Sequence, residues 1–185
     1  MNIILASGSP RRQQFLKDLG LDFEIRLKEI EEVYPNDLKG LEITDYLAHL
    51  KATPFLNELQ PNDVLITSDT IVWFENEAIG KPKDLADAKQ ILQKLSGKCH
   101  QVYTSVVLQS IDKQLCINET THVYFNELTP EMIDFYVDTF QPLDKAGAYG
   151  IQEWIGLVGI EKIEGSYTNI VGLPVEKVYK ALQNF

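Results

Sequence analysis

The chain has 185 residues, and its 44% hydrophobic and 24% charged residues are ordinary proportions for a globular protein. This length suits one sizeable domain, or one domain with two lobes around a cleft, and allows a hydrophobic core that needs no disulfide bonds. The formal net charge of −10 disfavours binding to a nucleic-acid polymer, but it leaves room for a small anion in a locally basic pocket.

Targeting signals and cysteine usage indicate the cellular compartment of a protein. No apolar run approaches the roughly 20 residues that span a bilayer, and the N-terminus shows no basic-then-apolar leader. Cys99 and Cys116 are the only cysteines, and neither has metal-ligand spacing. We therefore expect a cytoplasmic protein with reduced thiols and no membrane partner.

The first motif, Ser-Gly-Ser-Pro-Arg-Arg at residues 7–12, lies between an apolar predicted strand and a predicted helix. Ser9 is a good N-cap, and Pro10 suits the first helical position because it lacks the N–H that would remain unbonded. Arg11 and Arg12 then fall in the first turn, where the positive end of the helix dipole disfavours cations. A bound anion would resolve this conflict; two solvated surface arginines are the alternative.

The remaining elements follow from apolar spacing and from turn residues. In chain order they are a strand at 23–27, a helix at 42–59 that Pro54 divides, a strand from 64 to 74, a helix at 85–95, strands at about 100–110 and 115–125, a helix from 129, a strand around 157–163, a loop at 165–174 and a short final helix. Strands and helices do not alternate regularly as βαβ units. The pattern therefore predicts an α/β protein with a mixed sheet.

Two further segments place charges where packing alone does not explain them. Asp69 stands in an apolar, β-branched stretch, and a buried carboxylate is costly unless it is paired or metal-bound. It is a candidate general base or metal ligand, with a turn cap as the alternative. Lys81, between a glycine and a proline, suits contact with an anion, although a solvated lysine is the other interpretation.

A Gly-rich segment at 143–152 offers a third candidate site. Its small residues allow close approach of the backbone to a ligand, Lys145 supplies charge, and Gln152 supplies an edge with one donor and one acceptor. An ordinary Gly-rich turn is the alternative. The sequence contains no phosphate-binding GxxxxGK[ST] loop, no HExxH, no paired CxxC and no GxSxG.

Together these segments resemble the Maf family of nucleoside triphosphate pyrophosphatases. The matching stretches are Leu5–Arg12, Ser68–Thr70, Gly80–Pro82, Asp144–Gln152 and Gly172–Pro174, which occur in the family's order. The resemblance implies one Maf-like domain over residues 1–185, with a mixed sheet and two lobes around a central cleft, similar to the inosine triphosphate pyrophosphatases. It also implies hydrolysis of a nucleoside triphosphate to the monophosphate and pyrophosphate.

The resemblance also implies roles for particular residues. Asp69 would accept the proton of the attacking water, and Arg12, Thr70 and Gln152 look like the specificity set of the branch that acts on dTTP and UTP. The implied phosphate ligands are Ser7, Ser9, Arg11, Lys51, Lys81 and Lys145. Glu32, with Glu31 as the alternative, would help to hold a divalent cation, Mg²⁺ or Mn²⁺, through oxygen ligands.

Two other functions remain open from the sequence. One is the family branch that acts on 7-methyl-GTP, and the other is a nucleotide-sensing regulator of septum formation. The resemblance to the family further suggests a homodimer and a housecleaning activity that extends to modified pyrimidine triphosphates.

Overall fold

The structure, a computed structural model, describes all 185 residues of the chain. Its elements are β1 (Asn2–Leu5), α1 (Pro10–Asp18), β2 (Phe23–Ile25), α2 (Leu41–Ala52), η1 (Thr53–Phe55), β3 (Asp63–Phe74), β4 (Glu77–Ile79), α3 (Leu85–Leu95), β5 (Cys99–Gln109), β6 (Gln114–Phe125), α4 (Pro130–Phe140), η2 (Ala146–Ala148), α5 (Trp154–Val158), β7 (Ile160–Glu164), α6 (Tyr167–Val171) and α7 (Val175–Gln183).

The strands form one seven-stranded sheet. Its order is β2-β1-β3-β5-β6-β7, and β4 pairs with β3 outside this path. Strand β1 pairs in parallel with β2 and β3, whereas the pairs β3–β4 and β6–β7 are antiparallel. The sheet is therefore mixed, which confirms the predicted fold class.

The chain forms two compact units. The first unit comprises Met1–Thr70, Thr104–Glu119 and Gly172–Phe185, and the second comprises Ile71–Tyr103 and Thr120–Val171. Three long strands, β3, β5 and β6, contribute residues to both units. The expectation of a single domain with a central cleft stays a prediction.

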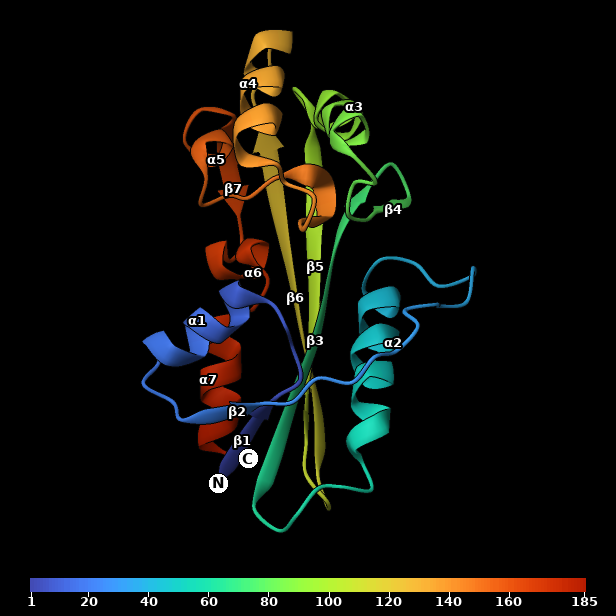
Figure 1. The fold of residues 1–185 in the computed structure, drawn as a ribbon, viewed down its shortest axis with the longest axis vertical. Helices are drawn as coiled ribbons and strands as arrows, with labels where there is room; N and C mark the ends of the chain where they lie inside the picture. The colour runs from blue at the N-terminus through green and yellow to red at the C-terminus, as the bar shows by residue number, and fades with distance from the viewer. The chain divides into compact units, whose positions relative to one another are not determined.

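In the first unit, side chains of β1 alternate between two apolar clusters. Ile3 and Leu5 pack in one cluster with Leu16 of α1 and Val178 of α7. Ile4 belongs to the other cluster, which the end of α2 and the segment after it complete. Figure 1 shows α1 and α7 on one side of β1 and α2 on the other. The period of two along a strand thus explains why both faces are covered.

The second unit has its own core. Leu92 of α3, Tyr136 of α4 and Ile155 of α5 are fully buried, and they join one cluster with Val72 of β3 and Val123 of β6. Helix α3 begins at the N-cap Asp84, whose carboxylate accepts the N–H of Asp87 at 2.8 Å. The structure therefore confirms the helix predicted at 85–95, the residue at which it begins and the apolar face that it buries.

Three local predictions meet different outcomes. The helix expected at 42–59 is divided, because α2 ends at Ala52 and a short 3₁₀ turn containing Pro54 follows. For the strand expected around 157–163, the predicted start is wrong, since residues 154–158 form α5 and β7 begins at Ile160. The segment 165–174 is not all loop, because Ser166 caps the turn of α6 by accepting the N–H of Asn169 at 3.3 Å.

None of the helices combines the length and apolar character that crossing a bilayer requires.

Candidate active site

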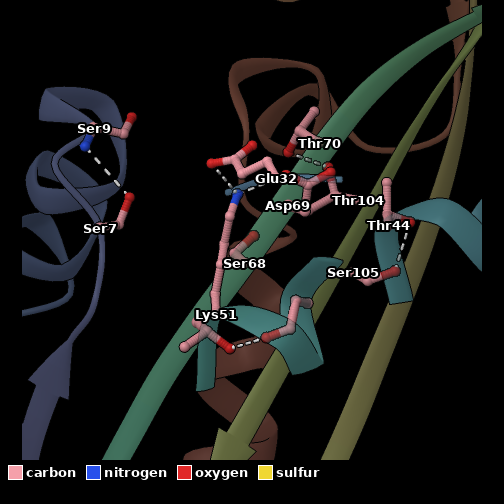
Figure 2. Close-up of polar contacts among 12 residues, drawn as sticks. Ser7, Ser9, Glu32, Thr44, Lys51, Ser68, Asp69, Thr70, Thr104 and Ser105 are labelled. Atoms are coloured by element: carbon pink, nitrogen blue, oxygen red, sulfur yellow. Dashed lines mark hydrogen bonds and ion pairs between the residues drawn. The ribbon is translucent and has the colours of Figure 1, made fainter. Parts of the chain in front are cut away.

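The turn between β1 and α1 has the geometry that its residues predict. Ser9 is the N-cap, its Oγ accepts the N–H of Arg12 at 3.5 Å, and Pro10 is the first helical residue. The N–H of Ser9 donates to Oγ of Ser7 at 3.3 Å, as Figure 2 shows. Both serines therefore lie in the turn that leads into the N-terminus of α1, where a helix favours anions.

Arg12 connects three segments of the first unit. Its Nε donates to the carbonyl of Gly172 at 2.8 Å, and its Nη1 donates to the carbonyl of Ser68 at 2.9 Å and to Oγ of Ser7 at 3.4 Å. Its Nη2 donates to Oγ1 of Thr70 at 3.0 Å. The planar guanidinium thus satisfies acceptors from the N-terminal turn, from β3 and from the segment before α7.

The electrostatics of Arg12 follow from this enclosure. Burial lowers the pKa of its guanidinium, the charge of Asp69 opposes that shift, and the neighbouring charge of Arg11 lowers the pKa further. A cation in the first turn of α1 is therefore compensated by carbonyl oxygens and by a carboxylate. Arg11 itself is half-buried in the same turn, and its contact with phosphate stays a prediction.

Lys51, in the last turn of α2, lies between two carboxylates. Its Nζ donates to Oδ1 of Asp69 at 2.7 Å and lies 3.1 Å from Oε1 of Glu32 (Figure 2). The side chain of Asp69 is only 8% exposed, whereas that of Glu32 is 55% exposed. Helix α2 is held against β3 by Thr67, whose hydroxyl donates to the carbonyl of Ala48 at 2.7 Å.

The second carboxylate oxygen of Asp69 has no partner. Oδ2 is buried and makes no hydrogen bond. The same is true of Oγ of the adjacent Ser68. Most buried polar atoms in proteins are paired, so an orphaned carboxylate oxygen indicates a place where a proton, a water molecule, a cation or a ligand binds. This is the chemical property that the predicted role of Asp69 requires.

Thr70 makes a further contact that the sequence did not reveal. Its Oγ1 lies 2.9 Å from Oγ1 of Thr104 and 3.5 Å from the carbonyl of Gly172. Thr104 is fully buried in β5. Threonine is common in strands because it is β-branched, so no local signal in the sequence could have identified Thr104 as a partner of Thr70.

The second unit brings two of the predicted motifs into contact. The N–H of Gly147, in the Gly-rich segment, donates to the carbonyl of Gly80 at 3.1 Å. Gly147 has φ of 72°, and a Cβ there would lie 2.7 Å from Cγ2 of Val72, so the position requires glycine. Lys81 is exposed and makes no ion pair, whereas Lys145 is buried with two carboxylate partners.

Gln152 lies at the surface of the second unit. It lines an open groove of ≈ 370 Å³ whose other walls include Leu157, Ile163 and Tyr167. Its side chain is exposed and accessible to a ligand.

Each unit thus gathers its own share of the predicted residues. The first unit holds Ser7, Ser9, Arg11, Arg12, Glu32, Lys51, Asp69 and Thr70, and the second holds Lys81, Lys145 and Gln152. Of the two acidic candidates in the loop after β2, it is Glu32 and not Glu31 that pairs with Lys51.

The donor set suits a divalent cation only in part. No group of three or more His, Cys, Asp or Glu side chains converges as a complete metal site. Glu32 and the unpartnered Oδ2 of Asp69 nonetheless offer oxygen ligands on either side of one ammonium. Mg²⁺ is commonly held by one or two carboxylates together with substrate phosphates, so these residues fit a cation that arrives with a phosphate ligand.

On a mixed-sheet α/β protein, a capped, basic helix N-terminus and a buried Lys–Asp pair are features that suit a small phosphate-bearing ligand. The chain belongs to the Maf-like protein family, whose match covers residues 2–185.

Relatives of known name agree with this membership. A dTTP/UTP pyrophosphatase of Flavobacterium psychrophilum is 61% identical over 98% of this chain and 93% of its own. Enzymes of the same name from Flavobacterium johnsoniae and Bacteroides thetaiotaomicron are 55% and 47% identical, over 97% and 98% of this chain and 93% and 94% of theirs.

Among solved structures, a HAM1 protein from Coxiella burnetii has a TM-score of 0.53 at 17% identity, covering 100% of both chains. The Ham1 protein of Staphylococcus aureus has a TM-score of 0.50 at 16% identity, over 68% of this chain and 72% of that one. These two structures share the fold.

Proposed function

We propose that this protein is a nucleoside triphosphate pyrophosphatase that hydrolyses dTTP and UTP to the monophosphate and pyrophosphate. Relatives that carry the name dTTP/UTP pyrophosphatase align with nearly the whole chain at 47–61% identity. The observation that carries the proposal is the Lys51–Asp69 pair, in which one carboxylate oxygen is held at 2.7 Å and the other is buried and unbonded.

Asp69 is the proposed proton acceptor for the attacking water. Hydrolysis of a phosphoanhydride requires a positioned water, a place for its proton and neutralisation of the phosphate charge. Lys51 binds Oδ1 and thereby fixes the carboxylate, which leaves Oδ2 to take the proton. The pair therefore supplies both the base and its orientation.

The phosphate ligands proposed for the reaction are cations, hydroxyls and the N-terminus of α1. Ser7 and Ser9 lie in the turn before that helix, and Arg11 lies in its first turn. Lys51, Lys81 and Lys145 complete the proposed set. Charge-assisted hydrogen bonds of this kind offset the negative charge of the triphosphate and of the leaving pyrophosphate.

A divalent cation, Mg²⁺ or Mn²⁺, belongs to the proposal. Glu32 is the residue that would hold it together with phosphate oxygens, while Oδ2 of Asp69 takes the proton. When bound, it would neutralise phosphate charge and act as a Lewis acid.

Selection of the pyrimidine base is assigned to Arg12, Thr70 and Gln152. The exposed amide of Gln152 offers one donor and one acceptor, which match a carbonyl and the N3–H of uracil or thymine. Arg12 binds Thr70 at 3.0 Å, so the first unit presents these two residues as one rigid pair.

A panel of triphosphates tests the proposed function directly. We expect turnover of dTTP, UTP and 5-substituted pyrimidine triphosphates with Mg²⁺ or Mn²⁺, with monophosphate and pyrophosphate as products. Asp69→Asn should abolish turnover and leave nucleotide affinity largely intact. No turnover of any pyrimidine triphosphate would contradict the proposal, and turnover of 7-methyl-GTP alone would place the protein in the other branch.

The proposal includes a homodimer in the cytoplasm. Light scattering on the purified protein checks the first point, with a mass near twice the 21.0 kDa of one chain as the expected result. Fractionation of cells that produce the protein checks the second.

A further inference from the structure

A buried tyrosine supports the loop that carries Gln152. Tyr136, on α4, is fully buried, and its hydroxyl donates to Oε2 of Glu153. The same hydroxyl accepts the N–H of Gly150 at 2.9 Å, and the N–H of Glu153 donates to the carbonyl of Gly150 at 2.9 Å. One phenol therefore binds both ends of the four-residue turn in which Gln152 lies.

Glu153 extends this connection to Lys145. Its Oε1 lies 3.1 Å from Nζ of Lys145, and its side chain is only 19% exposed. The other partner of Lys145 is Asp144, which is 57% exposed and lies 2.6 Å away. Because water screens the exposed pair more strongly than the shielded one, Glu153 is the partner that holds the ammonium in place.

The packing at Gly150 confirms that this pair occupies a defined space. A Cβ at Gly150 would lie 2.8 Å from Cδ of Glu153 and 3.0 Å from Cε of Lys145. Contacts this short force a neighbour to move, so a larger residue would displace the pair. A Cβ at Gly150 would therefore require the Glu153–Lys145 pair to shift.

The direction of the hydrogen bonds is set by the state of the phenol. Burial raises the pKa of Tyr136 above its ordinary value, and the hydrogen bond to Glu153 raises it further. The phenol therefore stays protonated at neutral pH, donates to the carboxylate and accepts the N–H of Gly150.

We propose that Tyr136 and Glu153 are positioning residues of the reaction, which act by holding the ammonium of Lys145 and the backbone that carries Gln152. This inference rests on the proposed function, since that function assigns Lys145 to phosphate and Gln152 to the base. Tyr136 acts through Glu153 and Gly150, and Glu153 acts through Lys145.

The chain offers a matched control in a second tyrosine, glutamate and lysine. The hydroxyl of Tyr124 donates to Oε2 of Glu164 at 2.9 Å, and Oε1 of Glu164 lies 2.5 Å from Nζ of Lys162. These residues also belong to the second unit, where Tyr124 is half-buried on β6 and Glu164 and Lys162 are exposed on β7; Tyr124 itself is not among the residues that line the groove with Gln152. Tyr124→Phe therefore removes the same chemical contact at a place without a proposed role.

The kinetic test compares Tyr136→Phe and Glu153→Gln with Tyr124→Phe, at a temperature where circular dichroism shows each variant folded. For Tyr136→Phe we expect a KM for dTTP raised more than kcat is lowered, and kcat/KM reduced about tenfold, because a buried N–H loses its acceptor. Glu153→Gln keeps the shape and removes the charge facing Lys145, so its KM should rise as well. Wild-type values for both variants would overturn the inference.

A double variant separates positioning from a general loss of stability. If Tyr136 acts through Lys145, the effect of Tyr136→Phe on kcat/KM should be much smaller in a Lys145→Met background, because the two changes then remove one shared interaction. The Tyr124→Phe change should be additive with Lys145→Met. Full additivity for Tyr136→Phe would contradict its action through Lys145.

Amide exchange tests the same idea without turnover. The N–H of Gly150 should exchange at least about tenfold faster in Tyr136→Phe and at the wild-type rate in Tyr124→Phe. If the wild-type protein hydrolyses no pyrimidine triphosphate, the proposed function fails and Tyr136 has no reaction to serve. If the wild type is active while exchange at Gly150 is unchanged in Tyr136→Phe, the inference alone fails.

Discussion

The ammonium of Lys51 donates to Oδ1 of Asp69 at 2.7 Å and leaves Oδ2 of the same carboxylate buried without a partner. One oxygen of Asp69 is thus held by the protein and the other is available for chemistry. The arrangement exists because α2 presents Lys51 in its last turn and Thr67 ties that helix to the strand that carries Asp69.

Lys51→Met should impair both folding and catalysis. It leaves the buried carboxylate of Asp69 without its cation, so we expect the free energy of unfolding to fall by about 1.5–3 kcal/mol. The loss of kcat/KM for dTTP should be at least about a hundredfold, since the base loses its orientation and the phosphate a cation. Urea unfolding and steady-state kinetics measure the two effects.

Lys94→Met is the matched control for that variant. Lys94 pairs with Glu77 at 2.9 Å, but the two side chains are 38% and 70% exposed, against 16% and 8% for Lys51 and Asp69. The change should therefore alter stability by less than about 1 kcal/mol. Equal effects of the two methionine variants would contradict the special position of Lys51.

Arg12→Lys should weaken the protein although the charge is kept. A lysine cannot reproduce the three directions in which the guanidinium reaches Gly172, Ser68 and Thr70. We expect the free energy of unfolding to fall by about 1–3 kcal/mol and the preference for dTTP over dCTP to decrease.

Arg26→Lys provides the comparison for Arg12→Lys. Arg26 also makes two guanidinium bonds, to Glu24 at 2.6 and 2.8 Å, but at an exposed site. Its replacement should leave stability and substrate preference close to wild type. Denaturant titration and a ratio of kcat/KM values for the two nucleotides check both variants.

Metal dependence should distinguish two adjacent glutamates. Chelation with EDTA should stop turnover, and Mg²⁺ or Mn²⁺ should restore it. Glu32→Gln should raise the metal concentration needed for half-maximal activity severalfold, because Glu32 contacts the ammonium of Lys51, which also binds Asp69. Glu31→Gln, a change of the same charge one residue away, should leave it unchanged. The reverse order would assign the metal to Glu31.

His100 should make the second unit sensitive to acid. Its ring is fully buried, Nε2 lies 2.8 Å from the hydroxyl of Tyr149, and burial lowers the pKa to about 3. The unfolded chain takes up a proton near pH 6.5 and the folded chain only near pH 3. The contribution of neutral His100 to the free energy of unfolding is therefore complete above pH 6.5. It is lost as pH falls toward 3, by about 1.4 kcal/mol per pH unit.

The variant His100→Gln isolates that contribution. It removes the titratable ring and keeps a polar group near Tyr149. Relative to wild type, its free energy of unfolding in urea should increase as pH falls from 6.5 to 4, because only the wild type loses stability by protonation of His100 in the unfolded chain. A difference independent of pH would show that His100 does not titrate in this way.

Cys116 should react slowly with alkylating agents. Burial raises the pKa of its thiol to about 12, and the neighbouring charge of Asp45 adds to the shift. Only the thiolate is nucleophilic, so iodoacetamide at pH 8 should modify Cys116 far more slowly than it modifies glutathione. Mass spectrometry of tryptic peptides gives the rate, and modification at the rate of the urea-unfolded chain would contradict the prediction.

The predictions from sequence succeeded where a structure depends on a few neighbouring residues. Ser9 and Pro10 specified the start of α1, and Pro54 specified the break after α2, because capping and the missing N–H act within one turn. The weakest predictions lay at 154–171, where five-residue helices replaced a predicted strand start and a loop. Short elements of this kind have too few residues for a periodic pattern to appear.

Family motifs indicated which residues carry the proposed chemistry, but not what each one contacts. Arg12 binds a carbonyl 160 positions away and a hydroxyl 58 positions away, contacts that the motif around it does not indicate. Thr104 and Tyr136 gave no signal at all, because a buried hydroxyl in a strand or helix looks like any other core residue.

The sequence by itself determined the mixed α/β class, the capped turn before α1 and the list of candidate residues, since these depend on local spacing and on side-chain type. Only the tertiary structure decided that Lys51 pairs with Glu32 and Asp69, and that Oδ2 of Asp69 stays unpaired. Such contacts join residues that are distant in the chain. They arise from the packing of α2 against β3, which no local pattern records.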